Sequence, residues 1–391
     1  MGFSEIREKD SAYIAHTYGR FNVDFVSGQG ATLVSSEGKK YTDFGSGIAV
    51  NTFGACDPVW QEAVTAQVHA LQHASNLYYT KPQTELAELL CKKTGAGKVF
   101  FGNSGAEANE CAIKAARKYS YDKYGEGRHG ILSMRNSFHG RTLATLTATG
   151  QDVMHPACFG PYPEGFSCCA PDAASVRKAA DETTCAVLIE PVQGESGVNL
   201  VPFEEMRKIA DFCRKRDLLL ICDEVQAGNG RTGKLYAYQH SGVSPDIVTT
   251  AKGLAGGLPL GACLLFGKCA DVFGPGDHGS TFGGNPVACA GAVSILSRID
   301  ENLLLEVQGK GDYLRTHLGR IRGVSEVTGL GLMIGLGLSN GKTAREVAEA
   351  CLDKGLIVLT AKNRVRLLPP LNVKKEEMDF ALQVLCEVIE K

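Results

Sequence analysis

A lone lysine at the end of a predicted strand is the first candidate for chemistry. Lys252 closes the run "DIVTTAK", and the next charge along the chain is Lys268. A lysine in such a place is most often solvated, with its stem lying on apolar surface. The alternative is an amine kept partly desolvated, and therefore neutral and nucleophilic. Lys252 alone does not decide between the two.

Two carboxylates stand at equivalent places in the same region. Glu190 follows the apolar run "CAVLI", and Asp223 follows "LLLIC". The carboxyl ends of parallel strands meet at one edge of a sheet, where open α/β folds bind their ligands. We therefore expect Glu190, Asp223 and Lys252 to converge on one crevice. A purely structural Asp–Lys ion pair remains the alternative.

An acid facing a desolvated lysine suits pyridoxal phosphate. The lysine amine condenses with the cofactor's aldehyde, and a carboxylate holds a proton on its pyridine nitrogen. Lys252 suits the first role and Asp223 the second. In "FFGNSGAEANECAIKAARKY" (100–119), backbone N–H groups of Gly105 and Ala106 at a helix start would bind the phosphate. Simple N-capping by Asn103 or Ser104 explains that motif equally well.

The segment "RNSFHGRTLATLTATG" (135–150) adds two candidates. Phe138 would stack on a pyridine ring, and Arg141 would hold a substrate carboxylate with two hydrogen bonds. The alternatives are a core phenylalanine and a surface ion pair. His139 is not needed as a base, because a lysine of this kind moves protons itself. "GNGRTG" (228–233) fits a dinucleotide motif but lacks the helix that should follow it, which excludes a nicotinamide dehydrogenase.

The elements that must position these residues alternate between strand and helix. Apolar runs at 185–191, 218–224 and 245–252 predict buried strands, and 203–217 predicts an amphipathic helix between the first two. This alternation predicts a mostly parallel sheet flanked by helices, with right-handed crossovers. We expect a large α/β domain over residues 45–285 to hold it.

The last third of the chain predicts a smaller α+β domain. Residues 324–338 read as paired strands, 343–355 as a helix ended by glycine, 363–371 as a strand and the final segment as an amphipathic helix. The hairpin-like segment 30–44 is expected to join them. The small domain is therefore predicted to combine residues 1–44 with 286–391.

Composition narrows the class of protein. A net charge of −2 with 21% charged residues gives no reason to expect nucleic acid or a membrane surface as partner. The longest stretch without charged residues, 278–297, opens "HGSTFGGNP" and is too polar to span a membrane. The 14 cysteines are scattered without CxxC spacing and there is no signal peptide, so we expect a cytoplasmic protein with reduced thiols. No metal site is expected.

Seven motifs together resemble the class III, fold-type I, pyridoxal-phosphate aminotransferases. They span nearly the whole chain in the family's order: "NSGAEANE", "SFHGRTLATLTATG", "EPVQGESGV", "LLLICDEVQAGNGRTGKLYAY", "TTAKGLAGGLPLGA", "GSTFGGNPVACA" and "VRLLPPL". The chain departs from the family in having Ala106 and Ala227 where threonine is usual and Ser196 where glycine is usual. Residues 53–58, "FGACDP", also differ from the usual "GHxHP".

The resemblance implies a role for each matching residue. Lys252 would carry the cofactor, Asp223 would pair with the pyridine nitrogen, and Phe138 would stack on the ring. Glu224, Val225 and Gln226 would lie at the cofactor, the last two against its ring. Phosphate would be bound by the N–H groups of Gly105 and Ala106 and by Thr281 from a partner subunit. The substrate residues would be Arg141, Ser280, Arg366 and Glu195, the last gating Arg366.

The same resemblance implies a homodimer with shared active sites that acts on small amino acids and 2-oxo acids. It favours N2-acetylornithine with 2-oxoglutarate, in arginine biosynthesis. Other ω-amines stay open as alternatives: succinyldiaminopimelate, succinylornithine, ornithine and 4-aminobutyrate. A non-catalytic binding protein on the same fold is the remaining alternative from a different class.

Overall fold

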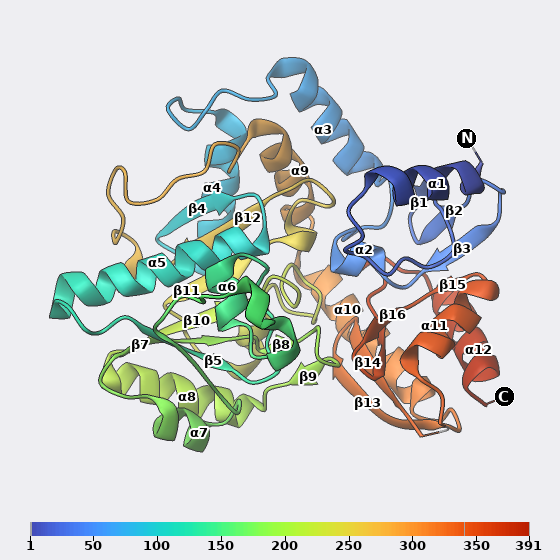
Figure 1. The fold of residues 1–391 in the computed structure, drawn as a ribbon. Coiled ribbons are helices and arrows are strands. Elements are labelled where there is room, and N and C mark those ends of the chain that lie inside the picture. Colours follow the sequence, from blue (N-terminus) through green and yellow to red (C-terminus); the bar gives the residue numbers. More distant parts are fainter. Residues whose placement is uncertain (1, 340, 391) are drawn as a thin grey trace.

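The computed structural model describes residues 2–339 and 341–390 and shows a large unit beside a small one (Figure 1). The N-terminal segment, blue in Figure 1, and the C-terminal segment, red, both belong to the small unit. The predicted outer limits of the domains, residues 1 and 391, lie outside the described residues.

The large unit is built on a seven-stranded sheet of order β4-β12-β11-β10-β7-β5-β6. Only β12 runs antiparallel to its neighbours, so the prediction of a mostly parallel sheet is confirmed. In that order the strands are Lys98–Gly102, Gly261–Leu265, Ile247–Thr250, Leu219–Asp223, Thr184–Ile189, Gly130–Met134 and Phe166–Cys169.

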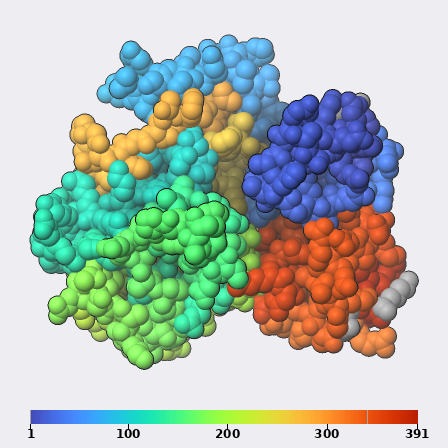
Figure 2. Space-filling view, in the orientation of Figure 1, coloured from blue at the N-terminus to red at the C-terminus, as the bar shows by residue number. Residues whose placement is uncertain are grey.

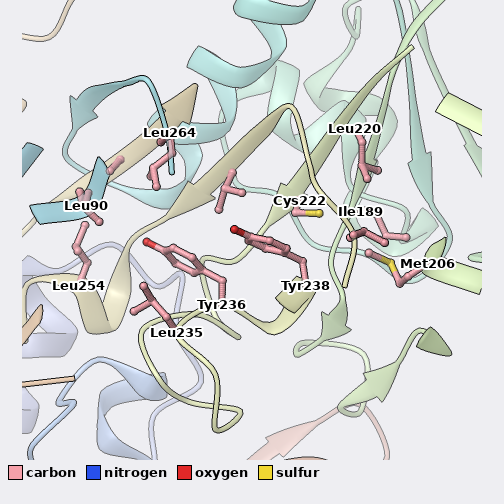
Figure 3. Packing of buried hydrophobic residues seen from close by; sticks show 14 of the residues in the cluster. Leu90, Ile189, Met206, Leu220, Cys222, Leu235, Tyr236, Tyr238, Leu254 and Leu264 are labelled. Atoms are coloured by element: carbon pink, nitrogen blue, oxygen red, sulfur yellow. The ribbon is translucent and has the colours of Figure 1, made fainter. Parts of the chain in front are cut away.

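Side chains of the central strands alternate between two buried faces. On one face, Leu219 and Ile221 of β10 pack with the alanines of α5 (Gly105–Tyr124). On the other, Leu220 and Cys222 pack with Met206 of α8 (Phe203–Arg216), as Figure 3 shows. Because helices cover both faces, these strands appear in the sequence as unbroken apolar runs.

Other elements complete the large unit. The helices are α3 (Pro58–Ala70), α4 (Lys81–Thr94), α6 (Leu143–Ala148), α7 (Ala173–Ala179) and α9 (Pro286–Leu296). The two-stranded hairpin β8 (Val192–Gln193) and β9 (Asn199–Leu200) reaches from the large unit toward the small one. The short α2 (Ser46–Ala49) is a turn with positive φ at every residue, including Ile48 at 66°.

The small unit contains two four-stranded sheets. One has the order β13-β14-β17-β16, all antiparallel: Val324–Leu330, Met333–Leu338, Arg364–Leu367 and Leu359–Ala361. The other joins β1 (Ser27–Gln29), β2 (Thr32–Val34) and β3 (Lys40–Asp43) to β15 (Leu356–Ile357). The helices are α1 (Phe3–Tyr13), α10 (Glu301–Leu318), α11 (Ala344–Asp353) and α12 (Lys375–Glu390). The N-terminal hairpin thus pairs with the C-terminal region through β3 and β15.

The expected domain boundary at residue 286 does not match the way helix α9 packs. Helix α9 lies along α3 and α4, and its Ala288, Cys289, Ala292 and Ile295 belong to the core of the large unit. The apolar residues of α10, such as Val307 and Leu314, belong to the core of the small unit instead. We therefore place the boundary near Asp300, where α10 is capped. Nothing in the sequence of α9 tells which core its apolar residues enter.

All 14 cysteines are unpaired thiols. Within 2–339 and 341–390, no helix has the length and apolar character needed to cross a membrane.

Candidate active site

A cavity of about 400 Å³ lies where the carboxyl ends of the central strands meet the start of α5. It brings together eight of the thirteen residues singled out from the sequence: Gly105, Ala106, Phe138, Arg141, Asp223, Val225, Gln226 and Lys252. Glu190 also lines it, so Glu190, Asp223 and Lys252 lie in one cavity.

Lys252 stands two residues after Thr250, the last residue of β11, and is held in a left-handed backbone conformation with φ 48°. Burial lowers the pKa of its amine. Nearby Glu195 opposes that shift, while the charge of Arg366 adds to it. A lysine of lowered pKa is more often neutral near pH 7, which is what a nucleophilic amine requires.

Asp223 ends β10 and is held by three hydrogen-bond donors. Its Oδ1 accepts from the backbone N–H of Val225 at 3.0 Å. Its Oδ2 accepts from Asn109 Nδ2 at 2.7 Å and from His139 Nδ1 at 2.8 Å. Asn109 is itself fixed by Thr249, whose hydroxyl donates to Oδ1 of Asn109 at 2.7 Å. Donors on both oxygens fix the orientation of the carboxyl group in the cavity.

Two of these supports were not singled out from the sequence. Asn109 stands one helical turn after Gly105, and that spacing alone would place it on the same side of α5. His139, which the sequence does not require as a base, is buried and bound to Asp223, with its Nε2 unpartnered in the described residues.

Glu190 is a second acid in the cavity with a different environment. Burial, reinforced by the charge of Asp223, raises the pKa of Glu190 well above its usual range. Its Oε2 accepts the backbone N–H of Phe138 at 2.9 Å. Burial thus favours the neutral form of Glu190, whose carboxyl group fixes the segment that carries Phe138.

The start of α5 is compatible with both interpretations of the "NSGAE" motif, helix capping and phosphate binding. Ser104 caps the helix by accepting the N–H of Glu107, which leaves the N–H groups of Gly105 and Ala106 without an acceptor inside the helix. A Cβ at Gly105 would lie 2.6 Å from Val225 Cγ1, so only glycine fits there without movement. An anion in the cavity can therefore accept hydrogen bonds from these two N–H groups.

These groups fit pyridoxal phosphate. The cavity offers an amine of lowered pKa for the aldehyde, a fixed carboxylate for the pyridine nitrogen and helix N-terminal amides for the phosphate. Phe138 and Val225 supply apolar lining for the ring.

Arg366 forms a closed cluster beside the cavity wall. Its Nη1 donates to Glu195 Oε1 at 2.8 Å, Gln226 Oε1 at 2.9 Å and the carbonyl of Gly194 at 3.1 Å. Gln226 Nε2 also donates to Glu195 Oε1 at 2.8 Å. Burial alone would raise the pKa of Glu195, but the charge and hydrogen bond of Arg366 bring it below the usual value.

The remaining predicted residues lie at the rim or outside the cavity. Arg141 is exposed at the rim, its guanidinium carbon 5.4 Å from the ring centroid of Phe138. Thr281 is exposed and Ser280 half-buried, and neither lines this cavity. Glu224 points behind the wall, where its two oxygens accept the N–H groups of Ala237 and Tyr238 at 2.9 and 2.7 Å.

Comparison with known proteins gives a consistent picture. The aminotransferase class-III family matches residues 13–389. The acetylornithine aminotransferase of Haemophilus ducreyi is 47% identical over 100% of this chain and 99% of its own. Among solved structures, the acetylornithine aminotransferase of Elizabethkingia anophelis has a TM-score of 0.88 at 32% identity, covering 100% and 99%. The ornithine aminotransferase of Toxoplasma gondii, with partial occupancy of PLP at its active site, has a TM-score of 0.94 at 30% identity, covering 99% and 94%.

Proposed function

The chain belongs to the class-III aminotransferases, and on that premise we propose that it transfers the terminal amino group of N2-acetylornithine to 2-oxoglutarate. The products are N-acetylglutamate 5-semialdehyde and glutamate, and the reaction serves arginine biosynthesis. The observation that carries the reaction type is the cavity in which Lys252 faces Asp223 with its three donors. The choice of amine rests on the full-length acetylornithine aminotransferase relatives.

Pyridoxal phosphate, the cofactor of this family, supplies an aldehyde that exchanges amines and a ring that takes up electrons. Lys252 would hold the cofactor through its Nζ, and the same amine would move the proton at the substrate carbon. Burial favours the neutral form of that amine, which both roles need. Asp223, oriented by Asn109 and His139, would hold the proton on the pyridine nitrogen.

Two arginines handle carboxylates at different distances from the reacting carbon. Arg141 at the rim binds the far carboxylate of either substrate. Glutamate carries a second carboxylate beside its reacting amine, and Arg366 is the cation available to it. Acetylornithine has no carboxylate beside its reacting amine, so Glu195 stays paired with Arg366. The pair keeps Arg366 from being a buried charge without a partner.

We propose that Ser280 and Thr281 complete the site of a second copy in a homodimer. They lie outside their own chain's cavity, in a loop that Asn76 ties down by donating to the carbonyls of Ser280 and Gly283. Leu77, Tyr78, Tyr79 and Phe282 nearby are 60–101% exposed, an apolar surface suited to a partner. In Figure 2 these two segments, light blue and orange, lie against each other at the upper left. The unpaired thiols fit the cytoplasmic setting proposed for the dimer.

A panel of amine donors tests the substrate. The purified enzyme, with pyridoxal phosphate and 2-oxoglutarate, should give its highest kcat/KM with N2-acetylornithine. Ornithine, 4-aminobutyrate and the succinylated amines are the competing donors. A higher kcat/KM with one of them would reassign the substrate. A visible cofactor absorbance that hydroxylamine abolishes, with no turnover of any donor, would instead favour a binding protein.

A further inference from the structure

The segment that carries Glu195 is the turn of a hairpin that reaches from the large unit into the small one. Residues 194–198, "GESGV", join β8 to β9, which pair through Gln193 and Asn199. In Figure 1, β9 points toward β13 and β14 of the small unit. The position of Glu195 therefore depends on contacts between the two units.

Val198 anchors this turn in the small unit. It is fully buried and clusters with Met333 and Leu368. A Cβ added to Gly329 would lie 2.9 Å from Val198 Cγ1, and one added to Gly335 would lie 3.0 Å from Val198 Cβ, so two glycines make the space it fills. Val198 has φ 59°, which is rare for a β-branched residue and persists only where packing enforces it.

Arg364 binds the same turn through hydrogen bonds. Its Nη1 donates to the carbonyl of Gly197 at 2.8 Å and to Asn199 Oδ1 at 2.9 Å, and lies 3.2 Å from Thr328 Oγ1. Its Nη2 pairs with Glu326 on β13. Asn199 in turn donates to the carbonyl of Ser196 at 3.1 Å, which carries the constraint to the residue next to Glu195.

Arg364 and Arg366 stand two positions apart on β17, and so on the same side of the strand. Arg366 binds the carbonyl of Gly194 and the side chain of Glu195, while Arg364 binds the other end of the turn. The backbone of Glu195 is thus held on both sides. Its carboxylate can leave Arg366 by side-chain rotation, and the turn itself stays in place.

We propose that Arg364 is a positioning residue for the Glu195–Arg366 ion pair. By fixing the turn 194–198 to the small unit, it makes the pair re-form whenever no second carboxylate occupies Arg366. It thereby sets the discrimination between an ω-amine and glutamate. This inference rests on the proposed function for its substrates.

Single-turnover half-reactions of Arg364→Ala test the proposal. Each half-reaction is followed through the cofactor absorbance of the holoenzyme. We expect the acetylornithine half-reaction to lose about 5- to 10-fold in kcat/KM and the glutamate half-reaction to change by less than about 2-fold. Added to Glu195→Ala, the substitution should cause no further loss, because both act on one ion pair. Equal losses in both half-reactions, or additive losses in the double variant, would overturn the proposal.

Controls separate this role from a structural one. Arg315→Ala removes another small-unit arginine that binds a backbone carbonyl, that of Gly331, without touching the turn, and should leave the ratio of half-reactions unchanged. Arg364→Lys, which keeps the charge but loses the fork, should give an intermediate ratio. If Arg364→Ala does not fold, Thr328→Val removes the second donor to Gly197 and should shift the ratio in the same direction.

A cofactor-independent measurement keeps the proposal distinct from the proposed function. Amide hydrogen exchange at residues 194–199 should be faster in Arg364→Ala than in the wild type. Exchange in the segments that pack around this hairpin should be unchanged. Unchanged exchange would overturn the proposal whatever the substrate. If the donor panel selects another ω-amine, that amine replaces acetylornithine in the half-reactions. The proposal then requires the same loss in its half-reaction relative to that of glutamate.

Discussion

Lys252 owes its proposed reactivity to the groups placed around it. Burial lowers its pKa, and the charge of Glu195 is the largest one that opposes this shift. Burial also raises the pKa of Glu190 and so favours its neutral form, which limits the negative charge around the amine. The amine is thereby kept from forming a permanent ion pair.

Replacing Lys252 with alanine should leave a folded protein that turns over at least roughly 10²- to 10⁴-fold more slowly, because it loses both the covalent anchor and the proton-transfer base. Borohydride reduction of the wild-type holoenzyme followed by peptide mapping should place the cofactor on Lys252. Lys268→Ala is the matched control, since the next lysine along the chain pairs with Asp217 outside the cavity. A label on any other lysine would refute the assignment.

Replacing Glu195 with alanine should leave Arg366 permanently free. The glutamate half-reaction should then be unchanged or faster. The acetylornithine half-reaction should slow, because a buried unpaired charge costs about 3–5 kcal/mol when fully desolvated. Single-turnover absorbance changes measure both. Glu204→Ala, an exposed glutamate on α8, is the control. If both half-reactions changed in rate by the same factor, Glu195 would have no gating role.

The sequence predicts the proposed catalytic residues better than the residues that hold them in place. Lys252 and Asp223 are foreseeable because strand ends of a parallel sheet meet at one edge. Glu224 was expected at the cofactor beside Asp223, but consecutive strand-end residues point to opposite sides, and its carboxylate binds the 237–238 amides instead. Asn109 acts on a residue 114 positions away, a contact that no local pattern contains.

At the level of elements, the end of α8 joins three parts of the large unit. Asp217, in a left-handed conformation with φ 48° and ψ 43°, follows the helix. It pairs with Lys123 of α5 and with Lys268, each at 2.8 Å, and accepts from the hydroxyl of Tyr124 at 2.6 Å. Burial alone would raise the pKa of Asp217, but these hydrogen bonds hold it well below its usual range.

Asp217→Asn should lower the free energy of unfolding by about 1 kcal/mol at pH 7, since asparagine keeps the left-handed backbone but not the charge. A carboxyl whose pKa is depressed on folding stabilises above its unfolded value, about 3.9, and loses that contribution as pH falls below it. The difference between variant and wild type should therefore shrink below pH 4. Urea unfolding across pH measures it.

Asp211→Asn, on the exposed side of α8, is the control for this experiment and should change stability by less than about 0.5 kcal/mol at any pH. A difference between Asp217→Asn and wild type that persists unchanged at low pH would show that the charge is not responsible.

Strands that are buried on both faces could be predicted from the sequence, whereas the strands and helices next to which elements lie could not. The runs at 218–224 and 245–252 contain β10 and β11, and the run at 185–191 contains all of β7 except Thr184, because a strand buried on both faces needs continuous apolar residues. The antiparallel direction of β12 and the packing of α9 on α3 and α4 depend on chain connections and distant surfaces. Local spacing carries no information about either.

At the level of the whole molecule, the proposed dimer makes each active site depend on two chains. A chain with Lys252→Ala mixed with a chain with Thr281→Ala should form hybrid dimers in which one site carries both changes and the other neither. Activity should therefore partly recover on subunit exchange, measured against each variant alone. No recovery despite exchange shown by mass-tagged subunits would count against a shared site.

The small unit is closed by segments from opposite ends of the chain, with consequences for translation. Thr42 of β3 pairs with Leu356 of β15, and Lys39 donates to the carbonyl of Asp353, 314 positions later. At about 5–20 residues per second, a ribosome needs roughly 15–60 s to supply that partner. For this time β3 presents an unpaired edge to other nascent chains, the situation in which strands associate wrongly. The first strands made are thus among the last to be folded.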